Sequence, residues 1–175
     1  SEAEQLCESG ADRRLYRSVG MTLINCIKSL MTYEPSDLQI AMKCCKHTMA
    51  IADVLRRKPG RLARFLPTAG APPLQQRTLQ EQHAELVFAE ATLLRAVLGI
   101  VYAGGTVGFV RQAMTLRNAY AIMRDLLRGL EEADAAVEEA NIQGRTSVKP
   151  VDQDLRSGIY LSNGLCQLIL SLLPK

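Results

Sequence analysis

The chain has 175 residues, of which 47% are hydrophobic and 22% are charged, and its formal net charge is +3. This composition is that of a globular domain and excludes a disordered chain, while the small net charge argues against a nucleic-acid-binding domain, which concentrates Lys and Arg on one face. Only 5% of the residues are aromatic and none is Trp, so the core must be built from aliphatic side chains, most of which are compatible with helices.

The first predicted helix spans about residues 12–32. One stripe of this helix is apolar, because its apolar residues recur at intervals of three and four. The stripe consists of Leu15, Val19, Leu23, Cys26, Ile27 and Leu30. We expect it to pack against a partner helix. Glu34 and Pro35 end the helix, and Ser36 with Gln39 has the spacing of a capping box, which predicts that a second helix begins near Ser36.

The second predicted helix completes an antiparallel hairpin over residues 12–57, since only a short linker separates the two helices. Its apolar face consists of Leu38, Ala41, Met42, Cys45, Met49, Ala52 and Leu55. Residues 58–77 then contain six Pro and Gly residues, which are too many for a continuous helix. We therefore predict a loop for this segment.

A second hairpin is predicted over residues 78–130. Thr78 and Glu81 have the capping-box spacing, and residues 86–103 are apolar almost all round, which is typical of a central helix. A glycine pair ends that helix, and Thr106 can cap the next one. The apolar face of the fourth helix consists of Phe109, Ala113, Leu116, Tyr120, Met123, Leu127 and Leu130.

Residues 131–151 form an acidic tail and linker, whose run EEADAAVEEAN can extend the fourth helix before Gly144 and Pro150 break the chain. A final helix is predicted over residues 152–173. No segment alternates β-branched residues as a strand does. The sequence therefore predicts one all-α domain of antiparallel helical hairpins, arranged as a degenerate TPR-like (tetratricopeptide-repeat-like) α-solenoid or as a bundle of about five helices.

The sequence gives no sign of a secretory route or a membrane span. Its polar start, SEAEQLCESG, lacks the basic and apolar regions of a signal peptide, and the apolar stretch 86–110 is interrupted by Glu90 and Arg95. The five cysteines are an odd number and include no CxxC pair, which predicts free thiols and a reducing compartment. We expect a cytoplasmic location, with the nucleus and the lipid-droplet surface as further possibilities.

Three patterns resemble chemical sites, but each has a structural explanation. His83 and Glu85 match the H-x-E of zinc deaminases, yet the sequence has no PCxxC segment to complete that metal site. Cys44, Cys45 and His47 are close in sequence, but a pair three residues apart supplies at most two ligands. The glycines before the fourth helix follow a helix rather than a strand and precede no GK[ST]. We therefore expect no catalytic residue, no metal, no cofactor and no enzymatic activity.

Glu90 and Arg95 place charges inside the most apolar helix. Because an unpaired buried charge is strongly unfavourable, we expect each to meet a polar partner on a neighbouring helix, for instance Glu90 with Arg117. A functional pair in a pocket is the alternative.

Two further features concern surfaces. Residues 56–66 interleave basic and large apolar side chains, a pattern that suits an anionic membrane, a lipid monolayer or an acidic partner. The residues concerned are Arg56, Arg57, Lys58, Arg61, Arg64 and Phe65. There are two alternatives: a solvated helix end with Leu62 and Phe65 folded back onto the core, or pairing of the basic residues with the acidic run 131–139. The final helix carries a leftover apolar face with Leu165, Leu168 and Leu172, which predicts self-association as a homodimer.

Three blocks, at residues 83–102, 107–123 and 157–174, resemble in order and spacing the family of tetratricopeptide repeat protein 39 and the inclusion body clearance proteins. The first block carries the pattern HAE-x-x-x-AE-x-x-L-x-x-A, the second F-[IV]-x-x-[GA]-x-x-[IL]-R-x-[AS]-Y, and the third ends in SLLP. The matching residues are His83, Ala84, Glu85, Ala89, Glu90, Leu93 and Ala96, then Phe109, Val110, Ala113, Leu116, Arg117, Ala119 and Tyr120, then Ser171 to Pro174.

This resemblance implies a non-catalytic, cytosolic helical-repeat protein that acts through protein partners in inclusion-body clearance and is connected to lipid droplets. The chain departs from the family at Gln112 and Ala113, where many members carry a Lys-Gly-Gly run, and we expect it to be the N-terminal part of a longer protein. Our leading hypothesis is a protein-interaction scaffold with no nucleic-acid partner. The alternative is a peripheral lipid- or membrane-surface-binding module that uses residues 56–66.

Overall fold

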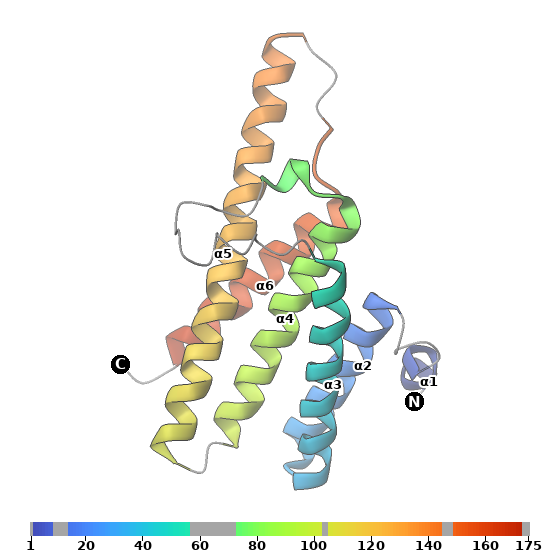
Figure 1. Ribbon diagram of the computed structural model, residues 1–175, viewed down its shortest axis with the longest axis vertical. Coiled ribbons are helices and arrows are strands. Elements are labelled where there is room, and N and C mark those ends of the chain that lie inside the picture. The colour runs from blue at the N-terminus through green and yellow to red at the C-terminus, as the bar shows by residue number, and fades with distance from the viewer. Residues whose placement is uncertain (1, 9–13, 57–72, 103–104, 145–148, 173–175) are drawn as a thin grey trace.

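The computed structural model describes residues 2–8, 14–56, 73–102, 105–144 and 149–172 (Figure 1). Its helices are α1 (Glu2–Glu8), α2 (Leu15–Thr32), α3 (Pro35–Leu55), α4 (Leu79–Val101), α5 (Thr106–Ile142) and α6 (Gln153–Leu172), with a 3₁₀ turn η2 (Leu74–Gln76). No strand occurs in these five stretches. The all-α prediction is therefore confirmed. Most of the predicted loop at 58–77 lies outside the described residues.

The helices stack as two antiparallel hairpins followed by one more helix. α2 packs on α3 and α4 on α5, and the hairpins join because α3 packs on α4 and α5 on α6. Alternate helices are also in contact, because α4 packs on α2 and on α6. In Figure 1, α6 crosses behind α4 and α5, and α2 lies behind α3. This order of contacts is that of an α-solenoid.

The beginnings of the helices differ from the prediction in two of three cases. The capping box at α4 is confirmed, since the Glu81 N–H donates to Thr78 Oγ1 at 3.2 Å and the Thr78 N–H donates to Glu81 Oε2 at 2.7 Å. At α3 the helix begins at Pro35, next to the predicted start, but the predicted capping box of Ser36 and Gln39 was wrong, because Glu34 is the N-cap and has no side-chain cap. Proline suits the first helical position, where its fixed φ is already helical and its missing N–H has no partner to lose. At α5 the predicted cap, Thr106, is already the first helical residue, and Gly105 is the N-cap.

The acidic run extends the fourth helix, as predicted. α5 continues to Ile142 and is 37 residues long. Ala133 and Ala140 are buried along this extension, and the Asp134 carboxylate pairs with both terminal nitrogens of Arg156 on α6. The guanidinium of Arg156 lowers the pKa of Asp134 through this hydrogen-bonded pair. The extension is thus tied to the start of α6.

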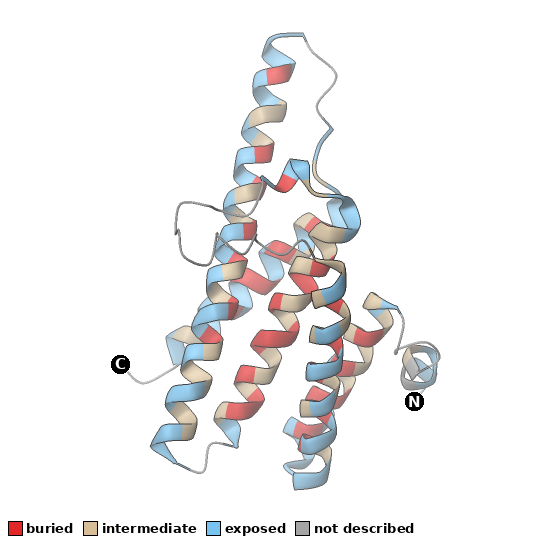
Figure 2. Ribbon diagram, viewed as in Figure 1, coloured by how far each residue is buried: buried red, intermediate tan, exposed pale blue. Residues whose placement is uncertain are grey.

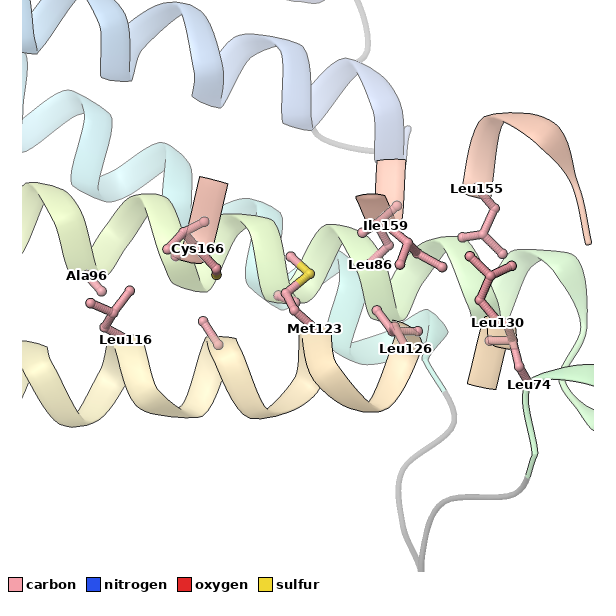
Figure 3. Close-up of a cluster of buried hydrophobic side chains, with 13 residues drawn as sticks. Leu74, Leu86, Ala96, Leu116, Met123, Leu126, Leu130, Leu155, Ile159 and Cys166 are labelled. Carbon is pink, nitrogen blue, oxygen red and sulfur yellow. The ribbon is translucent and has the colours of Figure 1, made fainter. Parts of the chain in front are cut away.

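The main core lies between α4, α5 and α6 (Figure 3). Figure 2 shows buried residues along most of α4, in agreement with its predicted central position. From α5, Leu116, Met123 and Leu130 are fully buried and point toward the space that α4 and α6 share. Leu155 and Ile159 of α6 close this core. Large aliphatic side chains therefore hold the second hairpin and α6 together.

The apolar stripe predicted for α2 is not its main packing face. Leu23, Ile27 and Leu30 are 47%, 52% and 37% exposed, and of the predicted stripe only Cys26 is fully buried. The buried positions of α2 are Ser18, Thr22, Asn25, Cys26 and Ser29. The prediction was wrong because small side chains allow α2 to approach α3 closely, and their hydroxyl groups find hydrogen-bond partners there.

The short helix α1 was not predicted, because its seven residues, EAEQLCE, contain a single large apolar side chain and show no clear periodicity. It packs on α2, where Cys7 lies against Gly20. A Cβ atom at Gly20 would lie 2.7 Å from Cys7 Sγ, so the approach of the two helices requires a glycine or a shift of the thiol. Among the described helices, none combines the length and apolar character needed to cross a membrane.

Candidate functional site

α2, α4 and α6 border an open groove of about 230 Å³. Val19 and Leu23 of α2 form one wall, Leu161 and Leu165 of α6 form the other, and Leu94 of α4 belongs to the floor. The three helices are the first members of successive stacked units, which is why they run side by side and meet along one face. The groove is therefore a product of the stacking and involves all three units.

Apolar residues extend both rims of the groove along the helices. On α2, Ile27 and Leu30 follow Leu23 by four and seven residues, so they lie on the same side of the helix. On α6, Leu168 and Leu172 follow Leu165 by three and seven. The five leucines and one isoleucine of these two rows, together with Leu161, are 37–76% exposed. Exposed apolar rows of this extent usually mark an interaction surface.

Glu90 places a carboxyl group in this apolar groove. Ser162 of α6 donates to Glu90 Oε1 at 2.6 Å, and no cation pairs with the carboxyl in the described part of the chain. Burial raises the pKa of Glu90, although the bond from Ser162 acts in the opposite direction. The predicted partner was wrong, since Arg117 lies exposed on α5. Glu90 is thus a largely buried acid whose hydrogen-bond partner among the described residues is the Ser162 hydroxyl.

A series of polar side-chain contacts joins the beginnings of the same three helices. The Tyr16 hydroxyl on α2 bonds to Nδ1 of His83 on α4, and His83 Nε2 lies 3.5 Å from Asp152 Oδ2, next to α6. Asp152 Oδ2 also accepts the backbone N–H groups of Asp154 and Leu155 at 3.1 Å and so caps α6. Burial, and then the charge of Glu90, raise the pKa of Tyr16 to about 12. These contacts hold the walls of the groove at a fixed spacing at one end.

The family model of Iml2/Tetratricopeptide repeat protein 39 matches residues 1–175, which is the whole chain. The chain belongs to this family. Among curated proteins, Tetratricopeptide repeat protein ttc-39B of Caenorhabditis elegans is 28% identical over 173 residues, which cover 99% of this chain and 28% of that protein. The chain therefore spans about a quarter of the length of this relative. No solved structure matches the chain.

Family membership confirms the resemblance seen in the three sequence blocks and extends it to the first hairpin, where only the helical pattern had suggested it. The groove itself was missed by sequence reasoning. Two signals pointed to it: the apolar stripe of α2, interpreted as a packing face, and Glu90 in an otherwise apolar helix. Neither signal identifies Leu161 or Ser162 as neighbours, because these residues follow Glu90 by about seventy positions.

The residues of the two metal-like sequence patterns contact different partners and do not converge on one point. Glu85 pairs with Arg56 at 3.3 Å, whereas His83 contacts Tyr16 and Asp152. On α3, Cys45 is fully buried with its Sγ 3.8 Å from Cys26 Sγ, while His47 is exposed. Within the described residues, no three His, Cys, Asp or Glu side chains gather as metal ligands would.

Of the predicted basic surface, only Arg56 belongs to the described residues. Its guanidinium lies 3.7 Å from the centroid of the Phe88 ring, and its nitrogens pair with Asp53 at 2.8 Å and Glu85 at 3.3 Å. The charge of Arg56 is therefore compensated by α3 and α4. The other residues of this surface, Arg57, Lys58, Arg61, Arg64 and Phe65, lie outside the described residues.

Proposed function

We propose that this chain is a non-catalytic interaction scaffold and that the groove between α2, α4 and α6 is its docking surface for protein partners. The observation that carries the proposal is the open apolar groove, with rims formed by exposed apolar rows of α2 and α6. Helical-repeat proteins commonly bind partners on the extended surface that their stacked units create. Membership in a family named for tetratricopeptide repeats supports the same interpretation.

For the biological role, we propose cytoplasmic protein homeostasis, with clearance of protein inclusions and a link to lipid droplets as the family resemblance implies. The chain covers 28% of its C. elegans relative, so a partner of the longer protein can also contact surfaces beyond this chain. The groove proposal concerns only the residues described above.

Site-specific photo-crosslinking tests the groove proposal. A photoreactive residue at Leu23 lies on the rim, whereas one at Val107 of α5 is 84% exposed and serves as the matched control. We expect partner proteins to crosslink at position 23 and not at position 107. Leu165→Glu in the Leu23-labelled chain should abolish the crosslinks. Equal crosslinking at the two positions, or crosslinks unaffected by Leu165→Glu, would contradict the groove as the docking surface.

The alternative, binding of an anionic membrane or lipid-droplet surface through residues 56–66, stays a hypothesis. Because the charge of Arg56 is compensated, this activity would depend on the other basic residues of the segment. Co-flotation with phosphatidylserine liposomes tests it, with Arg57→Glu, Arg61→Glu and Arg64→Glu combined in one variant. Equal flotation of the variant and the parent, or no flotation of the parent, contradicts the alternative.

A further inference from the structure

We propose that the groove selects an amphipathic helix that carries one Lys or Arg within its apolar face, and that this cation pairs with Glu90. This inference rests on the proposed function, because it names the chemistry of the partner that the same groove takes.

The walls of the groove favour a helix over an extended peptide. An extended peptide leaves its own backbone N–H and C=O groups to find partners in the groove or in water. α2, α4 and α6 satisfy their backbone groups internally and present only side chains to the groove, mainly apolar ones such as Leu23, Leu94 and Leu165. A helical partner satisfies its own backbone and presents side chains alone. It would also match the rims, whose residues repeat at the three- and four-residue spacing of interlocking helices.

Glu90 distinguishes this groove from a purely apolar one. Its carboxyl group accepts one hydrogen bond, from Ser162, although a carboxylate can accept about four. The nearby side chains that line the groove are leucines, alanine, valine and two threonines, and none of them carries a positive charge. Burying an acid without a cation is unfavourable, so an apolar residue would be the better choice for packing alone. A cation from the partner would convert this unfavourable group into a charge-assisted hydrogen bond.

A second copy of this chain does not meet this requirement through α6. The described helix α6 carries a single basic residue, Arg156, and its guanidinium is already paired with Asp134. Self-association through Leu168 and Leu172 would therefore cover the rim of α6 without supplying a cation to Glu90. The charge of the groove thus points to a different protein segment as its occupant.

A displayed library of 18-residue helices tests the inference. Each position of the apolar face carries Leu, Ile or Met in most library members and Lys, Arg, Glu or Gln in the others. A scrambled library of the same composition measures background binding. Selection is carried out on the full chain, on Glu90→Gln, and on Glu138→Gln, an exposed acid of α5. Glu90→Gln keeps an oxygen that accepts from Ser162, so the change removes the charge with little change of shape.

We expect the parent and Glu138→Gln to enrich helices with one Lys or Arg in the apolar face. Such a helix should bind about tenfold more tightly than its Lys→Met counterpart. On Glu90→Gln this ratio should fall to about one. Enrichment of helices without a cation, or a ratio unchanged by Glu90→Gln, overturns the inference and leaves the proposed function standing. No enrichment over the scrambled library, or binding that Leu23→Glu and Leu165→Glu do not reduce, overturns both.

Discussion

Between α4, α5 and α6 the buried side chains are large and aliphatic, whereas between α2 and α3 many are small and carry hydroxyl or thiol groups. The second arrangement centres on Thr48 of α3, whose hydroxyl bonds to the hydroxyls of Ser18 and Thr22 and also donates to the Ser18 carbonyl at 3.1 Å. The two hairpins are therefore held together by different interactions.

This difference explains why the first hairpin can present apolar side chains to the groove. A helix that packs through hydroxyl groups at close range does not need its large apolar residues for the interface with its partner. In α2 these residues, including Leu23 and Ile27, are left for the rim of the groove. In α5 the large apolar residues of the inward face, including Leu116 and Leu130, are buried in the core. The packing inside the first hairpin thus determines which of its apolar residues remain at the groove.

The largest loss of stability is expected from a substitution in the aliphatic core. Leu130→Ala removes a side chain that is 0% exposed and should lower the free energy of unfolding by about 2–5 kcal/mol, because a cavity remains. The matched change Leu161→Ala, at a residue that is 74% exposed, should alter it by less than about 0.5 kcal/mol. Urea unfolding measures both. Similar losses in the two variants would show that α6 buries its outer face and that the groove is closed.

A smaller loss is expected from the hydroxyl cluster. Thr48→Val leaves the hydroxyls of Ser18 and Thr22 buried without their common partner, which should cost about 1–3 kcal/mol. Combining it with Ser18→Ala and Thr22→Val should recover part of this loss, because no unpaired hydroxyl then remains. The control is Thr115→Val, since that hydroxyl bonds only within its own helix, to the Arg111 carbonyl. If the triple variant loses the sum of the single losses, the cluster is not a coupled network.

The sequence predicted the positions of five helices because periodicity, Pro and Gly act locally. It also predicted the extension of α5, since the run after Leu130 contains good helix formers and no breaker before Gly144. It failed on α2 for a physical reason. A stripe indicates which residues share a side of a helix but not which side faces inward, and hydrogen-bonded hydroxyls such as Thr22 can replace apolar contact.

The groove could be predicted only in part. Glu90 was noticed as a charge in an apolar helix, which is a property of neighbouring residues in the sequence. Its partner, Ser162, and the opposite wall at Leu165 come from another helix, and only the stacking of the units brings them together. The leftover apolar face of α6 was visible in the sequence, whereas its position beside α2 was not.

Self-association through α6 stays a prediction. Its measurement shows whether the apolar row of α6 forms a dimer interface while the apolar row of α2 does not. Leu168 and Leu172 are 58% and 76% exposed, so we expect a concentration-dependent dimer in analytical ultracentrifugation. Leu168→Glu combined with Leu172→Glu should weaken the dimer at least tenfold, which is about 1.4 kcal/mol, while Ile27→Glu on the α2 rim should leave it intact. A monomer at all concentrations would contradict this prediction.

The smallest expected effect is the pH dependence that Glu90 imposes on stability. Its pKa is raised by burial, so the folded chain holds this proton more tightly than the unfolded chain does. Where only the folded state retains the proton, stability falls as pH rises from the ordinary range of a glutamic acid toward neutrality. Glu90→Gln removes this contribution to the pH dependence of stability. Its free energy of unfolding, relative to the parent, should therefore increase between pH 4.5 and 7.5.

Among the described residues, Ser162 of α6 donates to the Glu90 carboxyl, and the charge of Glu90 acts on Tyr16 of α2. Ser162 favours the ionised acid, which is why the effect is expected to be small. Glu85 also has its pKa raised by burial, but it is unchanged in both proteins and cancels in the comparison. Glu138→Gln, at an exposed position of α5, is the control. A flat difference for Glu90→Gln would mean that a cation already reaches Glu90 in the unbound chain. The acid would then belong to the structural framework, as the aliphatic core does, and its charge would not be available to a partner.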